Sequence, residues 1–432
     1  MLVFASGCGD EKAAGVSSQY SVITGLVTDN PGTYISKRDY HGARPKEVAS
    51  PIQGATVVAM WVQPGGTPEA ISDTTETNAN GKFSLTCDVT DINNAIVVAT
   101  KGSTVTEAIV GATLTLGGTE YCQPIDEQTT IQAELYTGLV GSSNLESGTY
   151  PDIVFLVSEP VAAAAESDTA DIEQLASAIT AGENAWINAM ENSLVGNVAA
   201  GTTDQINLSR IKAEQSFESS LYSDGENTAL AKTAFINYLR ADQNSYLISG
   251  VSPEAVAEIA TVQARAELNA LSNSNSILRF AVKRQTSLVS AIMMTSAIDT
   301  SLELLFPPQT TLDSATIAGH NLAANLENST TTAEIDSAFE SYHGTILRLT
   351  AKALGGLVGL QVAAIDADIS AANGPRAALL SVSTLQLPPG DLVRTYAAFF
   401  QEVNSEVKSE LTGLPTFEVS SIASILTLTN ME

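Results

Sequence analysis

The spacing of apolar residues changes once along this chain, near residue 170, and that change constrains the fold more than any other feature. Between Tyr20 and Leu135, apolar and polar residues alternate in short β-branched runs, which is the period of β-strands. After Asp171 the apolar residues recur every three or four positions, which is the period of helices. We therefore predict a multi-domain α and β protein, with a small β-sandwich at 20–140, a linker at 141–167 and a large all-α bundle of long helices at 168–432.

The first region contains several segments with the composition of strands. Asn78–Gly81 separates two of them, and Asn-Gly supplies the positive φ angles that a tight hairpin turn requires. The predicted strands are Ser21–Asp29, Pro51–Ala59, Thr75–Thr77, Lys82–Leu85, Ile96–Thr100 and Ile131–Leu135.

Three of these pieces, Ile23–Asp29, Pro51–Val57 and Thr77–Phe83, occur in an order that resembles the carboxypeptidase regulatory-like domain, a transthyretin-like β-sandwich. The Gly-Ala and Asn-Gly pairs within them are the landmarks of the match. That family is usually a non-catalytic accessory module of exported proteins. The resemblance therefore implies an accessory role and supplies no catalytic residue.

A long loop between Asn30 and Ser50 departs from the pattern of that family. The loop holds four of the 20 basic residues, together with two tyrosines and a histidine. Tyr and Arg are common in binding hot spots, and long loops on rigid scaffolds often carry function. The alternative is a solvated loop whose charges pair with acidic surroundings. The candidate contact residues are Tyr34, Lys37, Arg38, Tyr40, His41, Arg44 and Lys46.

Cys8 follows the small residues Ala5-Ser6-Gly7 and precedes a polar segment, an arrangement that resembles the processing site of a bacterial lipoprotein. In that family the cysteine becomes the new N-terminus and carries lipid. The resemblance implies a signal remnant and flexible tether at 1–19 and a lipid anchor in the outer membrane, on its periplasmic or surface side. A chance match is the alternative, because little of a signal peptide precedes Cys8.

The remaining cysteines, Cys87 and Cys122, both fall in the β-rich region. An exported protein lies where thiols oxidise, so we predict a disulfide between them. Two buried thiols are the alternative, because free cysteine packs well in cores.

The chain carries 48 acidic against 20 basic residues, a net charge of −28. Such a charge repels nucleic acid and anionic headgroups. No apolar run is long enough to span a bilayer. We therefore expect a protein or glycan partner at the envelope, no nucleic acid, and membrane contact through the N-terminal lipid alone.

Several helix starts stand out in the second region. Asp171 and Ser252 are good N-caps, and Pro253 stands at the first helical position after Ser252. The helix after Ser252 is predicted to continue to Pro307. Further helices are predicted at 204–222, 227–247 and after Pro389.

The clearest helix start is Thr331, which forms a capping box with Glu334. From Ile335 the inner positions alternate four and three as far as Ala367, which is a heptad seam. The pattern predicts one helix of about 40 residues, about 60 Å long, that would act as a rod-like spacer. Gly355, Gly359 and Ala363, spaced at i, i+4 and i+8, indicate a tight helix crossing, or alternatively an oligomer interface or a membrane-active hairpin.

Residues able to bind metal are few. Glu340 and His343 fit Glu-x-x-His, but a di-iron site needs two such pairs and two more glutamates. Asp88, Asp91 and Asn93 offer oxygen ligands for Ca²⁺, without the pattern of an EF-hand. We therefore expect no cofactor, and Ca²⁺ is the only one for which the chain offers ligands.

No nucleophile, phosphate-loop or zinc-protease motif occurs in the sequence. We therefore expect no enzyme, but a lipid-anchored envelope protein that binds or scaffolds a partner protein, a glycan or copies of itself. One alternative is an enzyme or metal-binding protein with a site in the bundle or at the domain junction. Another is a subunit of an extracellular assembly.

Overall fold

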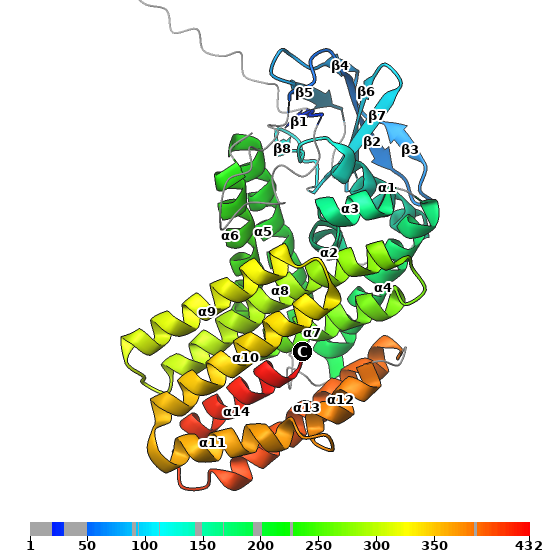
Figure 1. Cartoon of the computed structure of the whole chain (residues 1–432). Coiled ribbons are helices and arrows are strands. Elements are labelled where there is room, and N and C mark those ends of the chain that lie inside the picture. Colours follow the sequence, from blue (N-terminus) through cyan, green and yellow to red (C-terminus); the bar gives the residue numbers. More distant parts are fainter. Residues whose placement is uncertain are drawn as a thin grey trace, which may run out of the picture.

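A computed structural model of the chain describes residues 20–29, 50–88, 92–93, 95–111, 113–142, 149–166, 168–192, 201–224, 228–383 and 387–432. Cys8, the whole candidate contact loop from Tyr34 to Lys46, and Asp91 lie outside these residues. Within the described part, the strands lie at the N-terminal end of the chain and helices form the rest (Figure 1). The predicted order of a β part followed by a helical part is confirmed at this level.

The strands form two small sheets. One has the order β5–β1–β8, and the other has the order β3–β2–β6–β7, with β4 paired to β2. The strands are β1 Ser21–Leu26, β2 Thr56–Val62, β3 Pro68–Ala70, β4 Thr75–Glu76, β5 Lys82–Cys87, β6 Ala95–Lys101, β7 Thr104–Val110 and β8 Thr119–Tyr121. The sequence patterns missed β3, β7 and β8.

The two sheets pack their inward-facing side chains into one core. Val57 of β2 lies opposite Ala99 of β6, and Ile23 of β1 lies opposite Leu85 of β5. All four side chains are buried and belong to the same hydrophobic cluster. These four strands therefore contribute their inward residues to a shared interior, as the period of two requires.

The predicted turn at Asn78–Gly81 is present, but it does not close a hairpin, because β4 pairs with β2 and β5 pairs with β1. The side chain of Asn78 accepts hydrogen bonds from the backbone N–H groups of Asn80 and Lys82, at 2.9 and 3.0 Å. Gly81 has a φ of +68°, and a Cβ there would lie 2.6 Å from the carbonyl oxygen of Val27. Both the conformation and the space therefore require glycine.

The last predicted strand, Ile131–Leu135, is wrong. It lies inside helix α1, Glu127–Ser142. Asp126 begins this helix, because its carboxylate accepts from the backbone N–H of Thr129 at 3.0 Å. Ile131, Leu135 and Leu139 follow at intervals of four and are buried. A window of five residues looked alternating, whereas the full segment has the period of a helix.

The predicted linker at 141–167 is also wrong, because most of its described part is helical and buried. It contains α2, Thr149–Leu156, and α3, Glu159–Ala165. Ile153 and Val161 are fully buried, in a cluster that also includes Val62 of β2. These short helices lie between the sheets and the long helices (Figure 1).

Eleven further helices follow α3 in the described residues. They are α4 Thr169–Asn192, α5 Thr202–Asp224, α6 Thr228–Ile248, α7 Pro253–Ala270, α8 Ser276–Glu303, α9 Gln309–Asn328, α10 Thr332–Leu354, α11 Gly356–Ile369, α12 Pro375–Ser383, α13 Pro389–Glu410 and α14 Thr416–Asn430. The helices predicted for α4, α5, α6 and α13 are confirmed, and α9, α12 and α14 were missed. Asp171 is not the N-cap of α4 as predicted, because it lies inside the helix and Asp168 instead accepts from the N–H of Ala170 at 2.9 Å.

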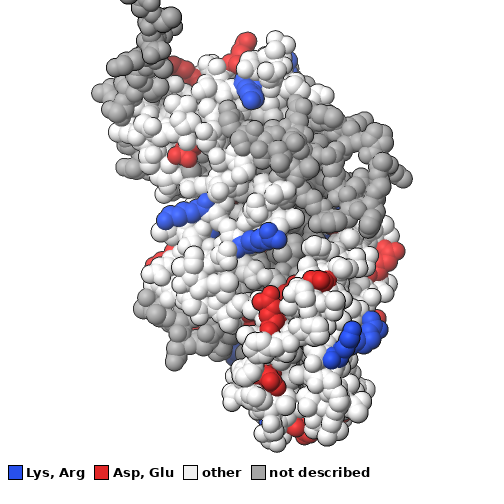
Figure 2. Space-filling model, turned by 90° about the vertical axis from the view of Figure 1, so that its left-hand side faces the viewer, with Lys and Arg blue, Asp and Glu red and all other residues white. Residues whose placement is uncertain are grey.

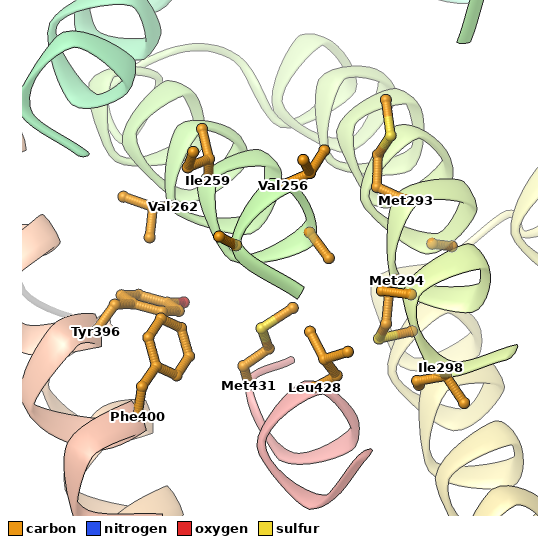
Figure 3. Packing of buried hydrophobic residues seen from close by; sticks show 14 of the residues in the cluster. Val256, Ile259, Val262, Met293, Met294, Ile298, Tyr396, Phe400, Leu428 and Met431 are labelled. Carbon is orange, nitrogen blue, oxygen red and sulfur yellow. The ribbon is translucent and has the colours of Figure 1, made fainter. Parts of the chain in front are cut away.

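Helices α7 and α8 run through the middle of the helical body, and α13 and α14 close one side of it (Figure 1). Figure 3 shows the core between them, to which Val256 of α7, Met294 of α8, Tyr396 of α13 and Leu428 of α14 all contribute. All of these residues are buried. Most of α14 is buried too, which makes it a central packing element.

The single helix predicted from Ser252 to Pro307 is two helices. Ser252 caps α7 as predicted, since its side chain accepts from the N–H of Ala255 at 3.2 Å. The chain then turns, and Asn275 caps α8 by accepting from the N–H of Leu278 at 2.7 Å. An N-cap inside the predicted helix therefore marked the missed break.

The helix of about 40 residues is also two helices. The capping box of Thr331 and Glu334 is present, and Ile335 and Tyr342 are buried as predicted. Gly355 and Gly356, with φ of +66° and +50°, then break the chain between α10 and α11. Beyond them the seam turns outward, because Leu360 is 69% exposed. The 60 Å rod is therefore wrong.

Among the residues that the structure describes, no helix combines the length and the apolar character needed to cross a bilayer.

Candidate functional site

Cys87 and Cys122 are buried thiols that are not joined to each other, so the predicted disulfide is corrected. Cys87 pairs with Ser21 on one side of β1, whereas Cys122 lies on the other side, level with Gly25. Across the sheet the two sites are thus two strand spacings apart, about 10 Å. Along β1 they are four residues apart, about 13 Å. A disulfide needs Cα atoms within about 7 Å. Burial raises the pKa of the Cys87 thiol to about 11, so this thiol is unreactive.

The structure does not bring Glu340 and His343 together as a ligand pair. His343 Nε2 lies 2.8 Å from the Oδ1 atom of Asp366 on α11. Glu340 is exposed and lines a cavity that His343 does not line. The same Oδ1 atom of Asp366 accepts from Asn430 at 2.9 Å, so the contact ties α10, α11 and α14 together.

The calcium candidates form no site in the described part of the chain. Asn93 accepts a hydrogen bond from Thr113 at 2.5 Å, Asp88 is exposed, and Asp91 lies outside the described residues. Across those residues, no group of three or more His, Cys, Asp and Glu side chains is placed to hold a metal.

A buried ion cluster, which we call the Arg210 cluster, lies where α2, α5 and α6 meet. The guanidinium of Arg210 donates to Asp152 at 2.9 Å and to Asp242 at 2.7 Å. All three side chains are almost completely buried. Burial raises the pKa of Asp242, although Arg210 acts in the opposite direction. One cation therefore holds two carboxylates inside the helical body.

Aromatic rings surround this guanidinium. The Trp186 ring lies 5.5 Å from its central carbon and the Tyr246 ring lies 6.0 Å away, which are cation–π distances. Trp186 also donates from Nε1 to the hydroxyl of Tyr246 at 2.6 Å. Burial acts to lower the pKa of Arg210, but Tyr246, Asp242 and Asp152 raise it well above its ordinary value. The side chain is therefore always charged.

The Arg210 cluster borders a cavity of about 50 Å³, which Glu267 of α7 and Gln285 of α8 also line. Asp152 Oδ2 and Arg210 Nη1 are buried with no hydrogen-bond partner among the described residues. The space suits roughly three waters at most. Burial raises the pKa of Glu267 well above its ordinary value, and Asp152 adds to the effect. This cavity can hold water, but it is too small for an organic substrate.

A larger cavity of about 410 Å³ lies between α7, α8, α10 and α12. Its walls carry three acidic side chains, Asp336, Glu340 and Glu432, and three basic ones, Arg265, Lys283 and Arg376, and we name it the basic cavity after the last three. Its volume falls within the range of about 300–1,000 Å³ for small-molecule sites. By contrast, the Lys and Arg side chains on the face shown in Figure 2 stand apart from one another.

The sequence contained a signal for the Arg210 cluster but none for the basic cavity. Arg210 follows Ile206 by four positions and precedes Phe217 by seven, on the buried face of α5. A charge in that register indicates a paired core residue. Arg265, Lys283 and Arg376 come from three different helices, and only tertiary packing brings them together.

Comparison of the chain with family models, with curated proteins and with solved structures found no match in any of the three.

Proposed function

We propose that this protein is a non-catalytic binding protein, held at the bacterial outer membrane by lipid on Cys8, whose helical body takes up a small ligand in the basic cavity. The observation that carries the proposal is the cavity itself, which has a volume of about 410 Å³ and is lined by three basic and three acidic side chains. Pockets of this size with a few convergent polar groups are the usual sites of small-molecule binding.

Two further features support binding over catalysis. The sequence of the strands near the N-terminus resembles that of the carboxypeptidase regulatory-like module, which would act as an accessory unit between the anchor and the helical body. The cavity at the Arg210 cluster has room for water only. The charges of that cluster are therefore assigned to structure.

The ligand is tested by native mass spectrometry of the full chain purified from its own envelope. We expect a bound small molecule that is lost on denaturation. Leu380, 36% exposed, lines the cavity, and Leu380→Trp should reduce its occupancy by narrowing the entrance. Leu360→Trp, on exposed α11, is the matched control and should keep the ligand. Full occupancy in Leu380→Trp would show that the ligand binds elsewhere.

The anchor is tested separately on the mature N-terminus. Mass spectrometry of protein from native cells should find a first residue Cys8 carrying acyl chains. An unmodified Met1 would remove the lipid anchor and leave the cavity proposal intact.

A predicted second contact surface is the loop from Tyr34 to Lys46, which would meet a partner protein or glycan. Neutralising Lys37, Arg38, Arg44 and Lys46 together should weaken capture of that partner from the envelope. Unchanged capture would contradict this role of the loop.

A further inference from the structure

The basic cavity brings three cations together beside three carboxylates, in a chain with few basic residues. Arg265, Lys283 and Arg376 are three of only 20 basic residues, against 48 acidic ones. Lys283 is already paired with Asp336, Nζ to Oδ1 at 2.7 Å. Among the described residues, neither guanidinium has so close a carboxylate partner, so these two groups are the candidates to receive an anion.

A carboxylate of the protein already lies in this cavity. Arg265 Nη2 is 3.9 Å from Glu432 Oε2, and Arg376 Nη2 donates to the carbonyl oxygen of Glu432 at 2.8 Å. A charge-assisted N–H···O⁻ bond normally measures about 2.7–2.9 Å, so the Arg265–Glu432 ion pair is loose. Arg376 Nε is buried with no partner among the described residues. The Arg376 guanidinium thus keeps one donor that Glu432 does not satisfy.

We propose that the basic cavity binds a small organic carboxylate between Arg265 and Arg376, and that the side chain of Glu432 occupies the ligand's position until the ligand displaces it. This assignment rests on the proposed function and names its ligand class. Arg guanidiniums match the planar geometry of a carboxylate through two parallel N–H···O bonds. Glu432 shows that a carboxylate on a flexible stem fits the space.

Burial works against the charge on Glu432. It raises the pKa of this side chain, although Arg265, Lys283 and Arg376 oppose the effect and Asp336 adds to it. A ligand carboxylate that forms closer bonds to both guanidiniums would satisfy the donors better. Displaced, the Glu432 side chain could return to water.

Isothermal titration of the full chain with succinate tests the assignment, and the neutral isostere succinamide is the matched probe. We expect succinate to bind and succinamide not to bind. Arg265→Gln and Arg376→Gln should each weaken succinate by about 10-fold or more, the range for losing a hydrogen bond to a charged group. Arg394 is an exposed residue of α13, so Arg394→Gln should leave the affinity for succinate unchanged.

Glu432→Gln is the decisive variant, because it should tighten succinate binding several-fold by removing a competing charge. A variant that failed to fold could not gain affinity. Unchanged or weaker binding in Glu432→Gln would show that Glu432 does not compete. Inorganic phosphate is the second probe, and phosphate binding more tightly than succinate would overturn the carboxylate assignment.

The two proposals fail in different ways. If succinate does not bind, yet native protein carries a neutral ligand that Leu380→Trp loses, the carboxylate assignment is wrong and the binding function stands. If native protein carries no ligand and neither anion binds, both proposals fall.

Discussion

Gly182 lies on α4 where that helix packs against α7. A Cβ at this position would lie 2.5 Å from Oε1 and 2.8 Å from Cγ of Glu267. Gly344, in the middle of α10, would meet no atom within 4 Å. A methyl group therefore has no room at Gly182 but has room at Gly344. We expect alanine to destabilise the protein at the first position and to stabilise it at the second.

We expect Gly182→Ala to lower the free energy of unfolding by about 1–3 kcal/mol, because overpacking against a buried side chain outweighs the gain in helix propensity. Gly344→Ala should raise it by about 0.5–1 kcal/mol, the ordinary difference between the two residues in a helix. Urea unfolding followed by circular dichroism measures both. Stabilisation by Gly182→Ala would contradict the close packing.

Glu267 should make stability depend on pH. Its pKa in the folded protein is raised, chiefly by burial, so the folded state binds the proton more tightly than the unfolded state does. The contribution of Glu267 to the free energy of unfolding is complete below the ordinary Glu pKa of about 4.3. It is lost as pH rises toward the pKa in the folded protein, by about 1.4 kcal/mol per pH unit.

Glu267→Gln removes this titration, so we expect a flatter stability profile and a higher melting temperature than the wild type at pH 8. Exposed Glu402→Gln is the control and should follow the wild-type profile. Melting temperatures from pH 4 to pH 8 provide the measurement. A Glu267→Gln profile parallel to the wild type would show that another group titrates.

At this scale the sequence predicted single residues best where the chemistry is local. Ser252 and Thr331 were identified as caps because a capping side chain bonds within its own first turn. Arg265 and Arg376 were not identified as partners, because nothing local connects them.

At the scale of elements, the junction of α10 and α11 is where the chain departs most from its heptad pattern. Gly355 and Gly356 both have positive φ, which L-residues other than glycine adopt at a cost. The break lets α11 turn away, and it places Leu357 and Leu360 on the surface.

Gly355→Ala is expected to destabilise the protein by about 1–2 kcal/mol, because a Cβ is strained at φ of +66°. In an unbroken helix the same substitution would stabilise by about 0.5–1 kcal/mol, so the sign decides between the two arrangements. Thermal unfolding measures the change, with Gly344→Ala as the reference for an unbroken helix.

Sequence periodicity predicted where helices begin better than where they break. From Ile335 to Ala367 the apolar residues keep their spacing of three and four in the sequence, on both sides of Gly355. This is because the chain becomes helical again in α11, directly after the break. Two consecutive left-handed residues cannot be read from the spacing of apolar residues. In α1 the opposite error arose, because five residues were too few to separate a period of two from a period near four.

For the whole molecule, the boundary that the sequence predicted as a linker is instead a core. One buried cluster includes Val62 and Ile109 of the sheet, Leu139 of α1, Val161 of α3 and Leu278 of α8. The β part and the helical body therefore share an interior, so we expect them to unfold together.

The two tryptophans allow a direct test, because Trp61 lies on β2 and Trp186 on α4. In Trp186→Phe, fluorescence reports on the sheet alone and circular dichroism at 222 nm reports mainly on the helices. We expect coincident midpoints in urea, as a single cooperative unit requires. An earlier fluorescence midpoint would show that the β part unfolds independently.

Arg210 also bears on the order in which this chain assembles. A guanidinium leaves water without a large penalty only when the carboxylates that neutralise it are in place. Those of Asp152 and Asp242 lie 58 and 32 residues away, in opposite directions along the chain. We therefore expect the interior around Arg210 to exclude water only after the segments that carry Asp152, Arg210 and Asp242 have packed together. Until then, the charge of Arg210 disfavours compact states in which the two carboxylates are absent.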